Sequence, residues 1–169
     1  MLGTRMLMRP PRRITLATVM AIAALLVAPL VWYLASPLIL TRSVSETAPT
    51  AAAQTRVASG QFRVVDGIHK GEGTAAIVQL ADGQRVLRLD DDFRVTNGPD
   101  LYVYLSGAPA PRSSAELHGL EAFEVAQLKG NVGSQNYQLP ADLDISQFRS
   151  VVIYCRRFTT VFSTAELAS

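Results

Sequence analysis

SVVIYCRRFTTVF, residues 150–162, contains the only cysteine of the chain, Cys155. The four residues before this cysteine are β-branched or aromatic, and such side chains favour a pleated, buried surface. Because side chains alternate along a strand, Val151 and Ile153 share one face with Cys155. The opposite face, which begins with Val152, is also apolar until the arginines start. We therefore expect a central strand that is buried on both sides and ends near Cys155.

Short strand-like segments separated by turn signals precede this stretch. The clearest turn is Asp82-Gly83, a two-residue hairpin signal. No segment sustains a 3.6-residue period; residues 108–118, with two prolines, are expected to be a loop, and 142–147 one short helical turn. The pattern predicts a mainly β fold, an antiparallel β-sandwich or a partly open barrel. The expected strands are 61–65, 74–80, 84–89, 101–105, 123–128, 135–139, 150–155 and 158–162.

The N-terminal part has the features of a membrane anchor. No charged residue occurs from Ile14 to Thr41, and this run is long enough to cross a bilayer as a helix. Four arginines precede it and only Arg42 follows closely, so the positive-inside rule places the N-terminus in the cytoplasm. We expect a cytoplasmic basic tail at 1–13 and a transmembrane signal anchor at 14–36. A cleaved signal peptide is the alternative.

A compositional change separates this anchor from the rest of the chain. The segment at 37–59 is rich in Ser, Thr, Ala and Pro and shows no apolar periodicity, so we expect a flexible linker. A β domain at 60–168 follows. This organisation predicts a single-pass protein of the cell membrane whose domain is extracytoplasmic.

Charge and motifs exclude several classes of function. Residues 1–56 contain six basic residues and one acidic residue, whereas the remainder contains ten basic and thirteen acidic residues. A nucleic-acid surface is not expected, because that function needs Lys and Arg clustered on a folded face. A single cysteine rules out an internal disulfide framework. No nucleophile elbow occurs, so nothing supports a stand-alone enzyme.

Cys155 is the leading candidate for chemistry. Arg157, expected on the same strand face, would favour the thiolate, which is the reactive form of cysteine. The alternative is that Cys155 is a small buried core residue. His69, in a glycine-rich connection, is a candidate ligand for haem or another cofactor, although such a histidine commonly bonds its own loop. No methionine follows Met20, which excludes a methionine ligand for haem or copper in the domain.

Several stretches in a fixed order resemble one family. They are His69 with two following glycines, NGPDLYVYL at 97–105, LKGNVGSQNYQLP at 128–140 and YCRRF at 154–158. Together they are similar to the DM-thirteen domain, the β-rich, single-cysteine module of Skeletor-type proteins. The layout of one membrane helix and one domain is similar to that of bacterial members. The resemblance implies a β-sandwich-like fold and an electron-transfer role in which Cys155 is a redox thiol or holds a group such as haem.

Two functions from different classes follow. The first is a membrane-tethered, extracytoplasmic redox or electron-transfer domain centred on Cys155, with His69 as a second ligand if a cofactor is held. Its partners would be the membrane, through the N-terminal helix, and a separate redox or envelope protein. The second is a non-catalytic binding or structural module of the cell envelope, in which Cys155 is core packing.

Overall fold

A computed structural model describes residues 15–49 and 55–168. The basic tail expected at 1–13 lies outside the described residues. The chain divides into two compact units, Met1–Ser36 and Pro37–Ser169, which we describe separately.

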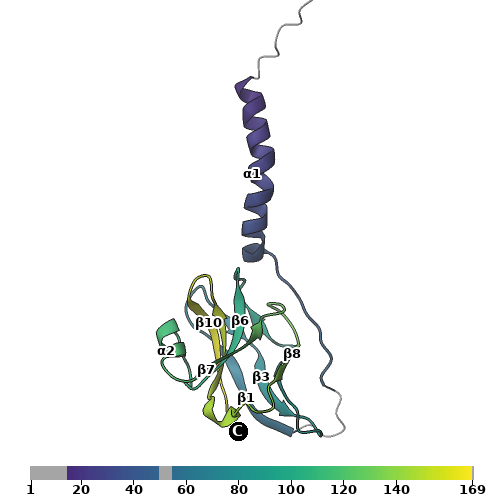
Figure 1. The fold of residues 1–169 in the computed structure, drawn as a ribbon, viewed down its shortest axis with the longest axis vertical. Helices are drawn as coiled ribbons and strands as arrows, with labels where there is room; N and C mark the ends of the chain where they lie inside the picture. The colour runs from purple at the N-terminus through teal and green to yellow at the C-terminus, as the bar shows by residue number, and fades with distance from the viewer. Residues whose placement is uncertain (1–14, 50–54, 169) are drawn as a thin grey trace, which may run out of the picture. The chain divides into compact units, whose positions relative to one another are not determined.

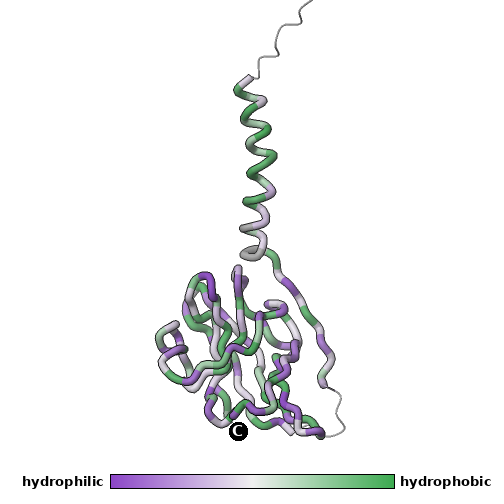
Figure 2. The backbone as a smooth tube through the Cα atoms, in the orientation of Figure 1, coloured by the Kyte–Doolittle hydropathy of each residue, from purple (hydrophilic) through white to green (hydrophobic). Residues whose placement is uncertain are grey.

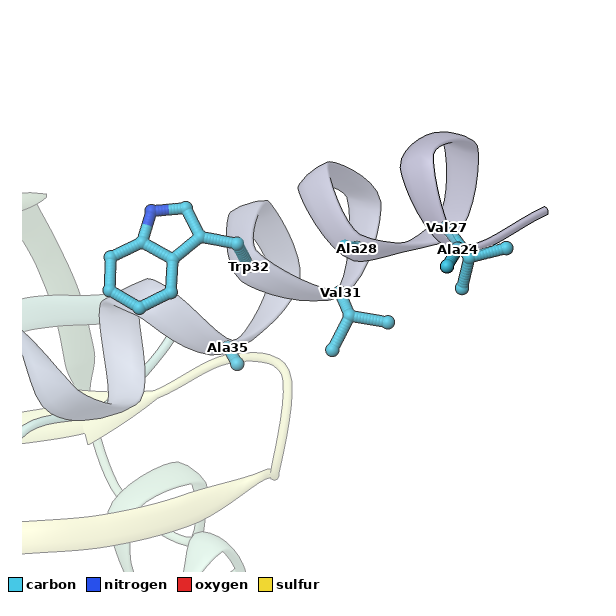
Figure 3. A pocket seen from close by; sticks show the side chains of 6 residues that line it. All are labelled: Ala24, Val27, Ala28, Val31, Trp32 and Ala35. Carbon is cyan, nitrogen blue, oxygen red and sulfur yellow. The ribbon is translucent and has the colours of Figure 1, made fainter. Parts of the chain in front are cut away.

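Most of helix α1 (Leu16–Ile39) lies in the first unit, and the helix continues three residues beyond the expected end of the anchor. Its window Leu16–Tyr33 has a mean hydropathy of 2.2, and none of it is buried within the protein. Figure 2 shows the helix as a largely hydrophobic segment. Figure 3 shows one apolar face along it, lined by Ala24, Val27, Ala28, Val31, Trp32 and Ala35. By length and composition α1 is able to span a membrane, a property that signal sequences share.

The second unit is an antiparallel β domain (Figure 1). Eight strands form one sheet in the order β7-β6-β9-β10-β1-β3-β4-β8, and the edge strands β7 and β8 contact each other, so the sheet is nearly closed into a barrel. This confirms the mainly β prediction and selects the partly open barrel. A separate ladder pairs β2 with β5. The strands are β1 (Thr55–Val64), β2 (Gly71–Glu72), β3 (Thr74–Gln79), β4 (Arg85–Leu89), β5 (Arg94–Val95), β6 (Leu101–Ser106), β7 (Ala122–Gln127), β8 (Gln135–Leu139), β9 (Ser150–Cys155) and β10 (Thr160–Glu166).

Strand β9 is central, as the sequence predicts. It lies between β6 and β10, and all six of its residues are buried. Its Val151, Ile153 and Cys155 side chains belong to the main core inside the barrel. Val152 and Tyr154 belong to a second cluster on the outer face of the sheet. The alternation expected for a strand buried on both sides is therefore confirmed.

The second cluster depends on a short helix that the sequence analysis treated as loop. Helix α2 (Ser114–His118) begins after Ser113, whose hydroxyl accepts a hydrogen bond from the Glu116 amide, so Ser113 is an N-cap. Leu117 projects from α2 and is completely buried against the outer face of the sheet. The two prolines of this region precede the helix, and one turn is too short to produce a visible 3.6-residue period. The expected turn at 142–147 is a 3₁₀ helix at Ile145–Gln147.

The expected flexible linker at 37–59 is wrong at both ends. Helix α1 continues to Ile39, and β1 begins at Thr55. Residues 42–47, called the docked segment below, lie alongside the loop between β7 and β8. The Val44 amide donates to the Val132 carbonyl at 2.9 Å, and the Glu46 amide donates to the Ser134 carbonyl at 3.0 Å. These bonds are made by backbone groups, so they leave no apolar pattern in the sequence.

Candidate functional site

Cys155 is the last residue of β9, and its side chain is completely buried. It is a free thiol that faces the main core, and its register partners are Leu101 on β6 and Thr160 on β10. The sequence prediction that it shares a face with Val151 and Ile153 is confirmed. The sulfur is therefore sealed from solvent, one residue before an exposed turn.

That turn determines where the two arginines lie. Sequence alternation predicts that Arg157 lies on the same strand face as Cys155. In the structure β9 ends at Cys155, so Arg157 lies instead in the exposed turn at 156–159. The Arg156 amide donates to the Asp100 carbonyl at 3.0 Å, which closes the turn against the NGPD motif. The guanidinium of Arg156 reaches the outer face of the sheet and lies 3.9 Å from the centre of the Tyr102 ring.

His69 is held by its own turn. The Asp66 carboxylate accepts hydrogen bonds from the Ile68 amide at 2.7 Å and from the His69 amide at 2.6 Å. His69 Nδ1 lies 2.7 Å from Asp66 Oδ2, so an imidazole protonated at Nδ1 donates to the carboxylate and leaves Nε2 for another partner. These hydrogen bonds from His69 and Ile68 lower the pKa of Asp66 from 3.8 to about 2.

His69 contacts, through Phe162, the core that encloses Cys155. The Phe162 ring lies 4.4 Å from the imidazole of His69, and Phe162 and Cys155 belong to the same buried core. Three open pockets on the domain, with volumes of about 480, 340 and 590 Å³, have neither His69 nor Cys155 in their lining. A haem held by both residues does not fit this arrangement, because the sulfur lies inside packed core. Among residues 15–49 and 55–168, no three His, Cys, Asp or Glu side chains are grouped to hold a metal ion.

On the opposite face of β9, three aromatic rings pack edge to face. The ring centres of Tyr104 and Tyr154 lie 5.6 Å apart, and His118 of α2 lies 6.1 Å from Tyr104 and 5.7 Å from Tyr154. The Tyr104 hydroxyl donates to a carboxylate oxygen of Glu124, and Arg156 pairs with that same carboxylate. Tyr102 and Tyr104 alternate along the strand expected at 101–105, but no local signal in the sequence joins them to Glu124 or His118.

The docked segment is held by the LKGNVGSQN motif. Lys129 Nζ lies 2.7 and 3.0 Å from the two carboxylate oxygens of Glu46, and the Asn136 amide donates to Glu46 at 2.7 Å. Burial opposes ionisation of Glu46, but these hydrogen bonds outweigh it and lower the pKa of its carboxyl group. A Cβ at Gly133, which has a φ of +90°, would lie 2.2 Å from the Val44 carbonyl oxygen. The motif glycine therefore leaves space for the docked segment.

Asn131 of the same motif connects the docked segment with NGPD. Its side chain accepts from the Arg42 amide at 2.6 Å and donates to Asn97 and to the Val95 carbonyl. Two motifs separated by about thirty residues thus meet at one hydrogen-bonded side chain. These hydrogen bonds of Asn131 give the two motifs a structural role, because they hold the docked segment, which follows α1 in the sequence, against the end of β5.

The fold and this site define a small antiparallel barrel whose single cysteine is sealed in the core. A sequence model of the family described as "Electron transfer DM13" matches residues 58–167. The chain belongs to this family, as its motifs predict. No curated protein and no solved structure gives a significant match.

Proposed function

We propose that this protein is a membrane-tethered electron-transfer module whose redox group is Cys155. The observation that carries the proposal is the electron-transfer family match over residues 58–167, which includes the only cysteine. No tryptophan or methionine occurs in the domain, so Cys155 and four tyrosines are its readily oxidised side chains.

The burial of Cys155 sets a condition on this role. The thiolate is the reactive form of cysteine, and a reagent does not reach a sulfur that is sealed in the core. Cys155 is, however, the last residue of β9, and the four residues after it are exposed. Local opening of the turn at 156–159 would expose the sulfur without unfolding the barrel. In that open form, Arg157 would favour the thiolate.

The tether in this proposal is α1. An uncleaved helix would hold the domain at the cell membrane, and the excess of arginines before it favours a cytoplasmic N-terminus and an extracytoplasmic domain. The electron partner would be a separate redox or envelope protein. Protease digestion of intact cells tests this topology: the domain should be degraded from outside while a tag at the N-terminus stays protected.

A redox titration of the full chain in lipid nanodiscs, with one-electron mediators, tests the function. The wild type should take up and release electrons reversibly, and the Cys155→Ala variant should lose this response while keeping its fold. A wild-type protein that exchanges no electrons, or an alanine variant with an unchanged response, would refute the proposal.

The complete burial of Cys155 favours a second candidate function, a non-catalytic binding or structural module of the cell envelope in which the thiol is core packing. Under this hypothesis, Cys155→Ala fully replaces the wild type in cells that lack the protein. Loss of function in a folded Cys155→Ala variant would contradict it.

A further inference from the structure

On the outer face of β6 and β9, Tyr104 is hydrogen-bonded to a carboxylate, a contact that differs from those of the neighbouring tyrosines. Tyr104 is buried, with 7% of its surface exposed, and its hydroxyl donates to Glu124 on β7. An ionised carboxylate is an acceptor that can take a proton, whereas an amide or hydroxyl oxygen is not a useful base. The phenol of Tyr104 therefore has a positioned proton acceptor in the resting protein.

The other tyrosines of the domain make different contacts. The Tyr154 hydroxyl lies 2.9 Å from Ser114 Oγ, and the Tyr137 hydroxyl donates to the Gln135 amide oxygen at 2.8 Å. Neither partner is a base. Tyr102 has the Arg156 cation over its ring, and a cation so placed disfavours loss of an electron from that ring. Within residues 55–168, Tyr104 is thus the tyrosine whose hydroxyl is bonded to a carboxylate.

Arg156 holds Glu124 and Tyr104 in register. Arg156 pairs with the Glu124 carboxylate, and its Nε lies 3.4 Å from the Tyr104 hydroxyl. Burial, followed by the hydrogen bond to Glu124, raises the pKa of Tyr104 above its ordinary value of 10. The phenol consequently keeps its proton at neutral pH, and removal of an electron requires that proton to move.

We propose that Tyr104 and Glu124 form a proton-coupled one-electron redox site. Tyr104 gives one electron to a one-electron oxidant, such as an oxidised metal complex. Its O–H bond breaks, and the proton forms a new O–H bond on Glu124. The products are a neutral tyrosyl radical, a neutral glutamic acid and the reduced oxidant. A one-electron reductant returns the electron, and the proton returns to Tyr104.

The use of this site in the cell rests on the proposed electron-transfer function, but the step itself does not involve Cys155. The exposed edge of His118 and the partly exposed Glu124 and Arg156 lie beside Tyr104, so a partner docked there would approach the ring closely. Tyr154, in edge-to-face contact with Tyr104, is the residue before Cys155. The site therefore gives the outer face of the sheet a redox group of its own.

The proposal is tested by flash oxidation of the full chain with a photo-oxidised ruthenium polypyridyl complex. Electron paramagnetic resonance then detects any tyrosyl radical that forms. Trp32→Phe and Tyr33→Phe substitutions in α1 remove oxidisable side chains outside the domain. In this background a tyrosyl radical should form and should disappear in Tyr104→Phe. It should persist in Tyr102→Phe, Tyr137→Phe and Tyr154→Phe.

Glu124→Gln should slow radical formation roughly 100-fold, the lower end of what a positioned proton acceptor contributes. Glu121→Gln, at an exposed carboxylate three residues earlier, is the matched control and should leave the rate unchanged. A radical that persists in Tyr104→Phe, or a Glu124→Gln rate equal to the control, would overturn the proposal. If Tyr104→Phe does not fold, the Glu124→Gln rate and the three remaining tyrosine variants decide. The same flash experiment on Cys155→Ala separates the two hypotheses. A mediator response that is unchanged in Cys155→Ala, together with an intact Tyr104 radical, refutes the cysteine role and leaves the tyrosine site standing; a mediator response lost in Cys155→Ala, with no Tyr104 radical in the wild-type Cys155 background, refutes the tyrosine site alone.

Discussion

Tyr154 and Cys155 are neighbours on β9, yet their side chains lie in two different packed clusters. The thiol is enclosed in the barrel core, and the phenol is packed against α2 on the outer face. One strand thus separates an inner sulfur from an outer group of aromatic rings. Substitutions at the two positions should consequently affect the two clusters independently.

Cys155→Ala should lower the free energy of unfolding by about 1 kcal/mol, since it removes one buried sulfur and leaves a small cavity. Cys155→Ser should cost more, roughly 1–3 kcal/mol, because it buries a hydroxyl where the main core offers apolar neighbours. Urea unfolding followed by the near-ultraviolet circular dichroism of the buried tyrosines measures both. A serine variant as stable as wild type would contradict the sealed, apolar environment of the sulfur.

Leu117→Ala should destabilise the domain by roughly 2–5 kcal/mol, the usual cost of truncating a fully buried leucine. Leu120→Ala is the matched control, since Leu120 is 61% exposed and should be nearly neutral. Urea unfolding of the two variants compares them directly. Equal stabilities would show that α2 does not seal the outer face of the sheet.

Gly133→Ala should release the docked segment, because a Cβ at this position would meet the Val44 carbonyl oxygen. Hydrogen exchange at the Val44 and Glu46 amides should accelerate, and trypsin should cleave after Arg42 more rapidly. Gly83→Ala is a control with positive φ at a site where the added Cβ meets no atom within 4 Å. Unchanged protection of Val44 in Gly133→Ala would contradict the docking of this segment.

The pKa of Asp66 should rise from about 2 toward 3.8 in His69→Ala, because the side-chain hydrogen bond from His69 is its largest cause. The sign follows from linkage: a carboxyl group with a lowered folded pKa stabilises the protein above its unfolded pKa. This stabilisation is lost as the pH falls from about 4 through about 2. Nuclear magnetic resonance titration of the Asp66 carboxyl group measures the change. An unshifted titration in the variant would contradict the turn geometry.

The long, periodic elements were predictable from the sequence. Strands β8 and β9 have the expected bounds, because alternation and turn residues define both clearly. β10 starts two residues later than expected, since Phe158 and Thr159 complete the turn, and Thr159 adopts a φ of +50°. The two-residue strands β2 and β5 are too short to show a period.

The site was predictable only in part. The cysteine and its strand face follow from local alternation, and the family follows from motif order. Burial of Cys155 depends on neighbours contributed by β6 and β10, which are distant in sequence. The contact of Tyr104 with Glu124 likewise joins positions twenty residues apart across a pair of strands. Such contacts are set by register, which a single sequence does not reveal.

The central claim is that Cys155 is the redox group, and the state of its sulfur tests this most directly. The full chain in nanodiscs is equilibrated at a series of potentials, denatured in acid, and treated with an alkylating reagent whose addition is counted by mass spectrometry. We predict that the alkylated fraction falls as the potential rises and recovers as it is lowered, with the midpoint of the mediator titration. In this step the thiols of two copies of the chain lose two electrons to the mediators and two protons to solvent, and their sulfurs form one disulfide. A sulfur that remains fully alkylatable at every potential, while the protein exchanges electrons, would contradict the claim.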